Sequence, residues 1–404
     1  MSEPRATAAP APPPPTPPRN RHVPALDGLR GVAIAGVLLF HTGHLPGGFL
    51  GVDLFFALSG YLITDLLLRE AAATGRISLP AFWGRRLRRL LPALTAMLAA
   101  VTVAAWALGP PGLVRTTLGD LPWAQFHLLN WHLLAESAGY WDRFGAERVF
   151  EHLWSIAVEE QFYLLWPPLV AAIVRFGRRP GPAVAAAAAL ISLASLLLAA
   201  ALAEDPSRVY TGTDTRACSL LLGALVAAPP VRDRLLRAVG RRAGALAASA
   251  ALGMGAMWLL AAGTGTPWLF GGGLFAHSLL AAALIALAAS EPDAAVSKLL
   301  ARRPLRWLGQ VSYSLYLWHW PVIVLLSPEA TGLGALPWTA MVWTVSIALA
   351  ALSKHLVEDT IRFRARWARG RSGLLALAAA TALIALLWTL LPEPAPPVVD
   401  VTRL

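Results

Sequence analysis

The chain is built from apolar runs of about the length that crosses a lipid bilayer. They fall at residues 26–43, 47–68, 91–109, 116–134, 153–174, 183–203, 216–229, 243–262, 269–289, 307–327, 336–356 and 373–391. Because an α-helix rises 1.5 Å per residue, roughly 20 apolar residues span the hydrocarbon core of a membrane. Hydrophobic residues make up 56% of the chain and charged residues only 14%. The sequence therefore predicts an all-α, polytopic integral membrane helical bundle.

The distribution of charge indicates which runs cross the membrane. The 116–134 run is polar for a lipid-facing helix, since it contains Asp120, Pro122, His127, Asn130 and His132. If this run does not cross and the N-terminus starts in the cytoplasm, the basic loops all fall inside, as the positive-inside rule requires. These loops are 69–89, 175–179, 232–242, 298–306 and 362–371. We therefore expect about eleven transmembrane helices, with residues 110–152 as a re-entrant or extracytoplasmic excursion.

Composition sets the expected domain limits. Residues 1–22 are rich in proline and alanine and predict a disordered cytoplasmic tail. The membrane domain is expected over 23–361, followed by a basic loop and an additional transmembrane helix over 362–391. A short extracytoplasmic tail, 392–404, leaves the C-terminus outside. Since the basic residues lie in short loops, the net charge of +11 indicates membrane topology rather than nucleic-acid binding.

The first apolar run contains the most unusual pair of residues. Arg30 and His41 are eleven positions apart, about 16 Å along a helix axis, and Asp27 precedes them. Alone, Arg30 fits an anchor that snorkels to the membrane surface, and His41 fits an interfacial histidine. Together in one apolar helix they favour a functional role, because ionisable groups are costly in lipid. An imidazole that titrates near neutral pH suits a general base.

Other polar residues interrupt later runs. Asp53 and Ser59 lie in 47–68, among glycines that allow close helix packing, so structural and functional interpretations are about equally favoured. Arginines at 85, 86, 88 and 89 precede the third run. Their guanidinium groups suit phosphate binding, although a positive-inside stop or an anionic-lipid contact is the more economical interpretation.

Two adjacent carboxylates, Glu159 and Glu160, lie between tryptophans near His152. Buried acids need partners, and His152 and His41 are candidate mates if their helices are neighbours; solvated acids in an interfacial aromatic belt are the alternative. Asp214 and Arg216 are two positions apart and do not face each other on a helix, so each is expected to pair elsewhere. The remaining candidates are His319, which tryptophans flank and which fits an interfacial residue, and Glu358.

Several sequence blocks resemble, in order, the membrane-bound acyltransferase 3 family of bacterial O-acetyltransferases, the O-antigen-modifying kind. The blocks are PALDGLRGVAIAGVLLFH, GVDLFFALSGYLI, RRLRRLLPA, HLWSIAVEEQFY, DTRACSLLLGALVA and SYSLYLWHWP, followed by the final Glu358. The resemblance covers about residues 24–360. One position departs from the family pattern, because Ile156 stands where leucine is usual.

The resemblance implies an enzyme that takes an acyl group, most often acetyl, from cytoplasmic acyl-CoA. The acceptor would be a hydroxyl of a carbohydrate or of a glycosylated small molecule. By motif, His41 is the catalytic histidine with Arg30 as its partner, and Arg86 and Arg89 are linked to donor binding. Glu159 and Glu160 together cover the acidic motif, and both remain candidates. The resemblance also implies the bacterial cytoplasmic membrane.

No metal cofactor is expected, since zinc-binding spacings are missing and Cys218 is the only cysteine. Some family members carry an extracytoplasmic esterase-like domain after an extra helix. Residues 392–404 leave no room for one, so acceptor delivery is expected to rely on the membrane domain or on a separate extracytoplasmic partner. A transporter or flippase for a polar lipid or sugar conjugate is the alternative function, because it explains the intramembrane charges equally well.

Overall fold

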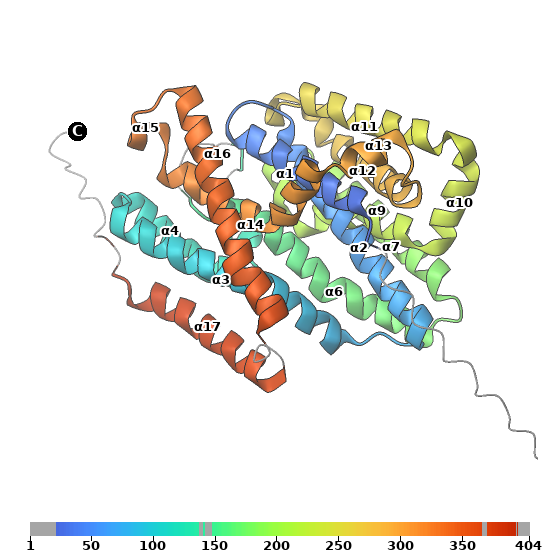
Figure 1. The fold of residues 1–404 in the computed structure, drawn as a ribbon, viewed down its shortest axis with the longest axis horizontal. Coiled ribbons are helices and arrows are strands. Elements are labelled where there is room, and N and C mark those ends of the chain that lie inside the picture. The colour runs from blue at the N-terminus through green and yellow to red at the C-terminus, as the bar shows by residue number, and fades with distance from the viewer. Residues whose placement is uncertain (1–21, 137–139, 142–147, 366–369, 393, 395–404) are drawn as a thin grey trace, which may run out of the picture.

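The computed structural model describes residues 22–136, 140–141, 148–365, 370–392 and 394. Over these residues the chain is helical and contains no strand, as the apolar pattern predicted. The tails expected at 1–22 and 392–404 lie outside the described residues, apart from His22, Pro392 and Pro394. Figure 1 shows the helices packed as one bundle, with α17 (Gly370–Leu390) along its margin.

Each predicted apolar run except 116–134 coincides with one longer helix. The longer helices are α1 (Pro24–His41), α2 (Gly51–Thr74), α3 (Leu79–Leu108), α6 (Trp154–Phe176), α7 (Pro180–Ala201), α9 (Thr213–Ala227), α11 (Ala243–Leu260), α12 (Gly273–Ser290), α14 (Arg303–Leu325) and α16 (Ala335–Leu352). Shorter helices connect them: α4 (Pro111–Gln125), α5 (Leu129–Ala135), α8 (Pro206–Thr211), α10 (Pro229–Val239), α13 (Ala295–Leu300) and α15 (Pro328–Thr331). Two π-helical segments, Ser353–Glu358 and Thr360–Arg364, extend α16.

The predicted excursion at 110–152 contains no single helix long enough to cross a membrane in its described part. The apolar run at 116–134 divides into α4 and α5, and the chain turns between them at His127. The φ angle of His127 is 56°, a left-handed conformation in which histidine is tolerated better than most side chains. A helix cannot continue through such a residue.

Seven helical stretches in the described part are long and apolar enough to cross a membrane. They are Pro24–His41, Gly48–Thr74, Leu79–Leu108, Pro180–Ala201, Pro229–Leu260, Gly273–Ser290 and Ala335–Arg364. The total of about eleven spans therefore stays a prediction. Large leucines face outward on several helices: Leu108 is 84% exposed, Leu336 76% and Leu252 75%. Outward leucines in such numbers fit a lipid-facing surface.

Glycines bring the central helices into close contact. A Cβ atom at Gly309 of α14 would lie 1.8 Å from the carbonyl oxygen of Asp27 on α1. At Gly60 of α2 it would lie 1.7 Å from the carbonyl oxygen of Leu220 on α9. Side chains larger than hydrogen would force these helices apart, and small residues are what membrane helices use where backbones approach. These close contacts bring the polar residues of α1, α2, α9 and α14 into the interior of the bundle.

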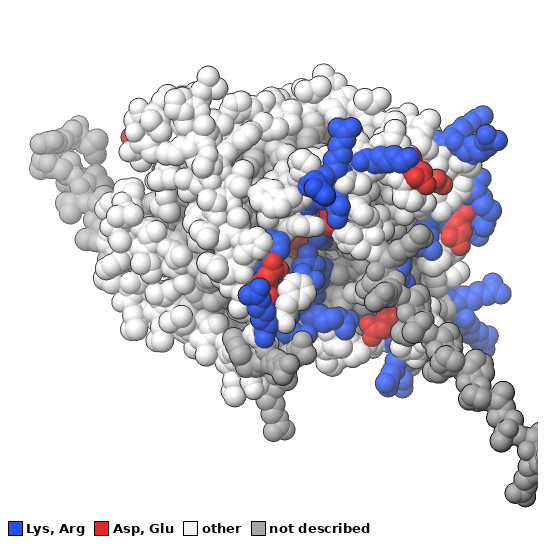
Figure 2. Space-filling view, viewed as in Figure 1, with Lys and Arg blue, Asp and Glu red and all other residues white. Residues whose placement is uncertain are grey.

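Charge is gathered over one end of the bundle, which we call the basic end. Figure 2 shows lysine and arginine there and a largely uncharged surface elsewhere on the visible face. Helix α1 starts at this end and finishes at the other with His41. Arg69, Arg232 and Arg362, which come from three of the loops that the sequence assigned to one side of the membrane, lie together at this end. We propose that the basic end faces the cytoplasm.

Candidate active site

A cavity of about 880 Å³ opens at the basic end, and we call it the basic cavity. Guanidinium groups from several helices surround it, with fewer carboxylates between them. Its charged residues are Asp27, Arg30, Asp65, Arg69, Arg85, Arg86, Arg88, Arg89, Arg232 and Arg362. Asp27 is bound by His22, whose Nε2 lies 2.7 Å from its Oδ2. So large an excess of positive charge attracts an anion with several phosphate groups.

A narrow pocket of about 70 Å³ continues inward from the basic cavity. Arg30, Arg86 and Arg89 line both spaces, so they form the junction between them. Farther along the helices, the narrow pocket is lined by Glu159 and Glu160 and then by apolar residues such as Phe56. Arg30 therefore lies at an internal junction rather than only anchoring the end of α1.

The two carboxylates of α6 lie in the same pocket but have different partners. Glu159 accepts hydrogen bonds from the hydroxyls of Ser59 and Tyr163. The Tyr163 hydroxyl is also 3.0 Å from Ser59 Oγ, and the Arg86 guanidinium lies 4.0 Å from the centre of the Tyr163 ring. Glu159 is thus held in place by α2 and α6, whereas Glu160 lines the pocket beside it.

At the opposite end of α1, His41 pairs with a histidine of α14. His41 Nδ1 lies 2.9 Å from His319 Nε2. His319 Nδ1 faces the carbonyl oxygens of Leu315 and Tyr316, at 3.1 and 2.8 Å. A neutral imidazole has one donor and one acceptor nitrogen. This network therefore assigns the His319 proton to Nδ1, makes His41 Nδ1 the donor to His319, and leaves His41 Nε2 as the basic nitrogen.

Two histidine expectations need correction. His152 and His41, the candidate mates of Glu159 and Glu160, have other contacts: His152 Nε2 lies 3.2 Å from the carbonyl oxygen of Leu317 and its ring packs against His319, while His41 faces His319. His319 is not interfacial, since it is only 1% exposed. The pairing of α1 with α14 through glycines, which no single segment of sequence reveals, brings His319 to His41.

Tyr316 stands between the narrow pocket and the histidines. It lines the pocket, and its ring centre is 5.3 Å from that of His319 and 5.5 Å from that of His152. Its hydroxyl lies 2.7 Å from Ser155 Oγ and donates to the carbonyl oxygen of His152 at 2.9 Å. His41 does not line the pocket. Tyr316 therefore both lines the space open to the basic end and lies next to the imidazole of His319.

The other predicted polar residues form separate contacts. Arg216 and Asp53 make an ion pair of 2.7 Å in which both side chains are at most 1% exposed. Asp214 binds Arg208 through two hydrogen bonds of 2.8 and 2.6 Å. Asp214 and Arg216 thus pair elsewhere, as their spacing indicated. Glu358, in the π-helical segment after α16, accepts a hydrogen bond from Ser314.

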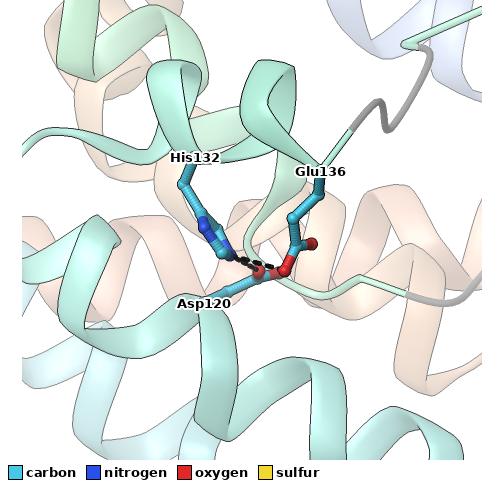
Figure 3. A group of neighbouring side chains, drawn as sticks. All are labelled: Asp120, His132 and Glu136. Atoms are coloured by element: carbon cyan, nitrogen blue, oxygen red, sulfur yellow. Dashed lines mark ion pairs between the residues drawn. The ribbon is translucent and has the colours of Figure 1, made fainter.

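A second cluster of titratable residues lies at the α4–α5 corner (Figure 3) and escaped the sequence analysis. Ligand-type atoms of Asp120, His132 and Glu136 all lie within 4.8 Å of one another. The i, i+4 spacing of His132 and Glu136 was the signal that could have found it. Arg148 binds both carboxylates, with Nη1 2.5 Å from Asp120 Oδ1.

The guanidinium of Arg148 thus occupies the position that would attract a cation. Burial lowers its pKa, but the carboxylates of Asp120 and Glu136 outweigh burial, so its pKa lies above the ordinary value. We therefore interpret the cluster as an ion-pair network rather than a metal site. The Arg148 carbonyl oxygen accepts a hydrogen bond of 2.9 Å from Trp320 Nε1, and the Trp320 ring packs against His41.

The bundle of apolar helices defines a membrane protein. Its basic entrance, buried carboxylates and imidazole pair are typical of an active site inside the bundle. The chain belongs to the acyltransferase domain family Acyl_transf_3, whose model matches residues 23–353. This agrees with the resemblance seen in the sequence blocks. The family assignment makes the chain an acyltransferase and lends no support to the transporter alternative.

Similar proteins carry related names. Over 350 residues the chain is 34% identical to peptidoglycan O-acetyltransferase OatA of Listeria monocytogenes, covering 85% of this chain and 56% of that protein. Over 353 residues it is 36% identical to O-acetyltransferase OatA of Staphylococcus aureus, covering 85% and 57%. The chain thus spans little more than half the length of these relatives. No solved structure matches it.

Proposed function

We propose that this chain transfers an acetyl group from cytoplasmic acetyl-CoA to a hydroxyl of a cell-envelope carbohydrate, with peptidoglycan as the first acceptor to test. One observation carries the proposal. The basic cavity leads through Arg30 into a pocket that ends one tyrosine ring from the His41–His319 pair. The named activity of the OatA relatives supports the choice of acceptor.

The arginines suit the donor end of this reaction. Coenzyme A carries several phosphate groups, which guanidinium groups bind through paired, charge-assisted hydrogen bonds. Arg86 and Arg89 face both the basic cavity and the narrow pocket. They are therefore placed to hold the phosphates while the thin pantetheine arm and the thioester extend past Arg30 toward Glu159 and Glu160.

The imidazole pair suits the acceptor end. His41 Nε2 would take the proton of the acceptor hydroxyl while its oxygen attacks the thioester carbonyl carbon. The carbon–sulfur bond then breaks, and the thiolate leaves and receives the proton as free coenzyme A. His319 accepts the hydrogen bond from His41 Nδ1 and so stabilises the imidazolium that forms. In this proposal the Tyr316 ring lies between the thioester in the narrow pocket and the acceptor hydroxyl at His41. The ring therefore has to move to another rotamer during acetyl transfer.

Donor binding is tested first, with purified full-length protein and acetyl-CoA in a calorimetric titration. Hydrogen bonds to charged groups contribute about 1.5–3 kcal/mol, so Arg86→Gln and Arg89→Gln should each raise the Kd roughly 10- to 100-fold. Arg237, exposed on α10 and remote from both cavities, supplies the matched control Arg237→Gln. Unchanged affinity in both cavity variants would refute the donor site.

Catalysis is tested by mass spectrometry of cell-wall glycan from cells that express the variants. His41→Ala should abolish O-acetylation, because general-base catalysis contributes about 10²–10⁴-fold. His44→Ala, in the loop after α1, is the control and should leave the product intact. Acetylated glycan from correctly folded His41→Ala would remove His41 from the reaction.

Orientation can be tested with cysteine labelling, since the native Cys218 is only 3% exposed. The proposal expects His44→Cys to react with a membrane-impermeant maleimide in intact cells. Arg237→Cys, at the basic end, should react only after permeabilisation. The reverse pattern would put the basic cavity on the side without coenzyme A. Acceptor delivery by a separate extracytoplasmic partner belongs to the same proposal, and acetylation by the purified chain alone would make it unnecessary.

A further inference from the structure

An apolar groove of about 360 Å³ lies between α3 and α17, and we call it the α3–α17 groove. On α3 its lining repeats every three or four residues from Gly84 to Ala99, which makes one face of the helix. Gly373, Ala380 and Leu383 line it from α17. Among the described residues that line it, Arg88 alone is charged, and Arg88 also lines the basic cavity.

Small residues explain why the groove stays open. Ala96 and Ala99 on α3 face a side of α17 that presents Gly373, Ala376 and Ala380, so no large side chain fills the gap. The far end is closed, because Ile384 of α17 is 1% exposed. There Gln125 Nε2 of α4 donates a hydrogen bond of 2.8 Å to the Thr381 carbonyl oxygen. At its other end the groove meets the basic cavity, because Arg88 lines both; helix α17, which forms one wall, lies along the margin of the bundle in Figure 1.

The dimensions fit a hydrocarbon chain. From Gly84 to Ala99 the groove follows α3 for about 22 Å, more than half of a hydrocarbon core of about 30 Å. Its α3 wall belongs to a candidate membrane span, Leu79–Leu108, so bilayer lipid has access to it. Apart from Arg88 and Thr95, the residues that line this slot are apolar or glycine, so it suits a hydrocarbon chain better than ordered water.

The positive charge of Arg88, where the groove meets the basic cavity, determines which kind of lipid head group would bind there. Among the described residues no carboxylate lies within ion-pair distance of Arg88, unlike Arg85, which is 3.5 Å from Glu70. A guanidinium without an acidic partner at the end of a membrane helix attracts a lipid phosphate. We propose that the α3–α17 groove binds one acyl chain of an anionic phospholipid whose phosphate rests on Arg88. The bound lipid fills the gap between α17 and the part of the chain that the family model matches.

Lipid binding is measured directly, by native mass spectrometry of the delipidated full-length protein titrated with phosphatidylglycerol or phosphatidylcholine. The expected result is one phosphatidylglycerol per chain at concentrations where phosphatidylcholine stays unbound. Ala96→Phe and Ala380→Phe, made singly, place a ring in the groove and should abolish this binding. Arg88→Gln should weaken it about 10-fold or more and reduce the preference for the anionic head group.

Matched variants control for non-specific effects. Ala100 is exposed on the same helix outside the groove, and Arg76 is exposed before α3, so Ala100→Phe and Arg76→Gln should bind lipid as the native chain does. Arg88→Gln removes no packing, so it keeps the test valid if a phenylalanine variant misfolds. Equal retention of both lipids, or full retention by Arg88→Gln, would overturn the proposal. Displacement of phosphatidylglycerol by a lower concentration of palmitoyl-CoA would also overturn it and assign the groove to a donor chain.

Discussion

His41 Nδ1 lies 2.9 Å from Nε2 of His319, a residue 278 positions later in the chain. His319 Nδ1 faces two backbone carbonyl oxygens and therefore carries the proton, so His319 Nε2 can only accept a hydrogen bond from His41. The pair therefore sets which nitrogen of His41 is basic, and it stabilises the imidazolium after proton transfer. A hydrogen bond to a charged group contributes about 1.5–3 kcal/mol.

Substituting His319 should consequently reduce turnover without abolishing donor binding. His319→Phe is expected to lower kcat roughly 10- to 100-fold and to leave the Kd for acetyl-CoA unchanged, because the arginines lie at the other end of α1. Steady-state acetyl transfer and a binding titration measure the two quantities. A variant that loses donor binding and turnover together would indicate a structural role for His319 instead.

Glu159 and Glu160 should respond differently to the loss of Ser59. Ser59 donates a hydrogen bond to Glu159, while Glu160 lines the pocket without that contact. A double-mutant cycle of Ser59→Ala with Glu159→Gln is expected to show coupling of about 0.5–3 kcal/mol in transition-state free energy. The cycle with Glu160→Gln should be additive within about 0.5 kcal/mol. Equal coupling in both cycles would mean that the two carboxylates act as one unit.

The Asp53–Arg216 pair provides a prediction about stability. Removing one partner leaves a buried charge uncompensated, so Arg216→Met should cost about 3–5 kcal/mol and lower the unfolding midpoint in detergent. Adding Asp53→Leu should recover most of the loss, because the remaining charge disappears. Arg208→Met is the surface control, since Asp214 is 41% exposed and such pairs contribute at most about 1 kcal/mol. No recovery in the double variant would contradict the ion-pair explanation.

The fold could be predicted closely because bilayer physics acts on local sequence. Every apolar run other than 116–134 became one helix, since backbone groups in lipid must be hydrogen-bonded within the segment. The boundaries shifted where polar residues continue a helix beyond the membrane, as in α3, which starts at Leu79 and not at 91. The polar 116–134 run broke at His127, in keeping with its exclusion from the spans.

Partners in the candidate site depended on contacts between distant segments. The sequence indicated that Asp53 and Arg216 needed partners, because ionisable groups in apolar helices are costly, whereas His319 fitted an interfacial residue. It did not show which residues would meet, since glycine contacts such as Gly309 with Asp27 decide the pairing of helices. The Arg148 network was missed for a similar reason. Asp120 lies on α4, whereas His132 and Glu136 lie on and directly after α5, so the group forms only when these two helices pack together.

The turn at His127 should make stability depend on pH. Burial lowers the pKa of His127 to about 4, from an ordinary value of 6.5. Between these values the unfolded chain binds more protons than the folded one, so stability rises with pH and is lost as pH falls from 6.5 toward 4. His127→Asn keeps a residue that tolerates φ 56° and removes the titration. Unfolding midpoints at pH 5 and pH 8 should therefore differ less in the variant, and an unchanged difference would refute this assignment.

Substitutions of Tyr316 test whether its ring keeps the donor thioester apart from the acceptor site at His41. Its ring closes the narrow pocket, and its hydroxyl contacts Ser155 Oγ and the His152 carbonyl oxygen. Tyr316→Phe keeps the ring but loses both hydrogen bonds, which together contribute about 1–3 kcal/mol, so acetyl transfer should change by no more than about 100-fold in either direction.

Tyr316→Ala instead opens the partition. Water and thioester then share one space, so acetyl-CoA should be hydrolysed without an acceptor while acetylation of glycan falls. The ratio of free coenzyme A released to acetyl groups transferred measures this uncoupling, with the Phe variant as the control. A ratio that stays near one in Tyr316→Ala would show that the ring is no barrier. Donor and acceptor would then meet by a route other than the line from Arg30 through Tyr316 to His41.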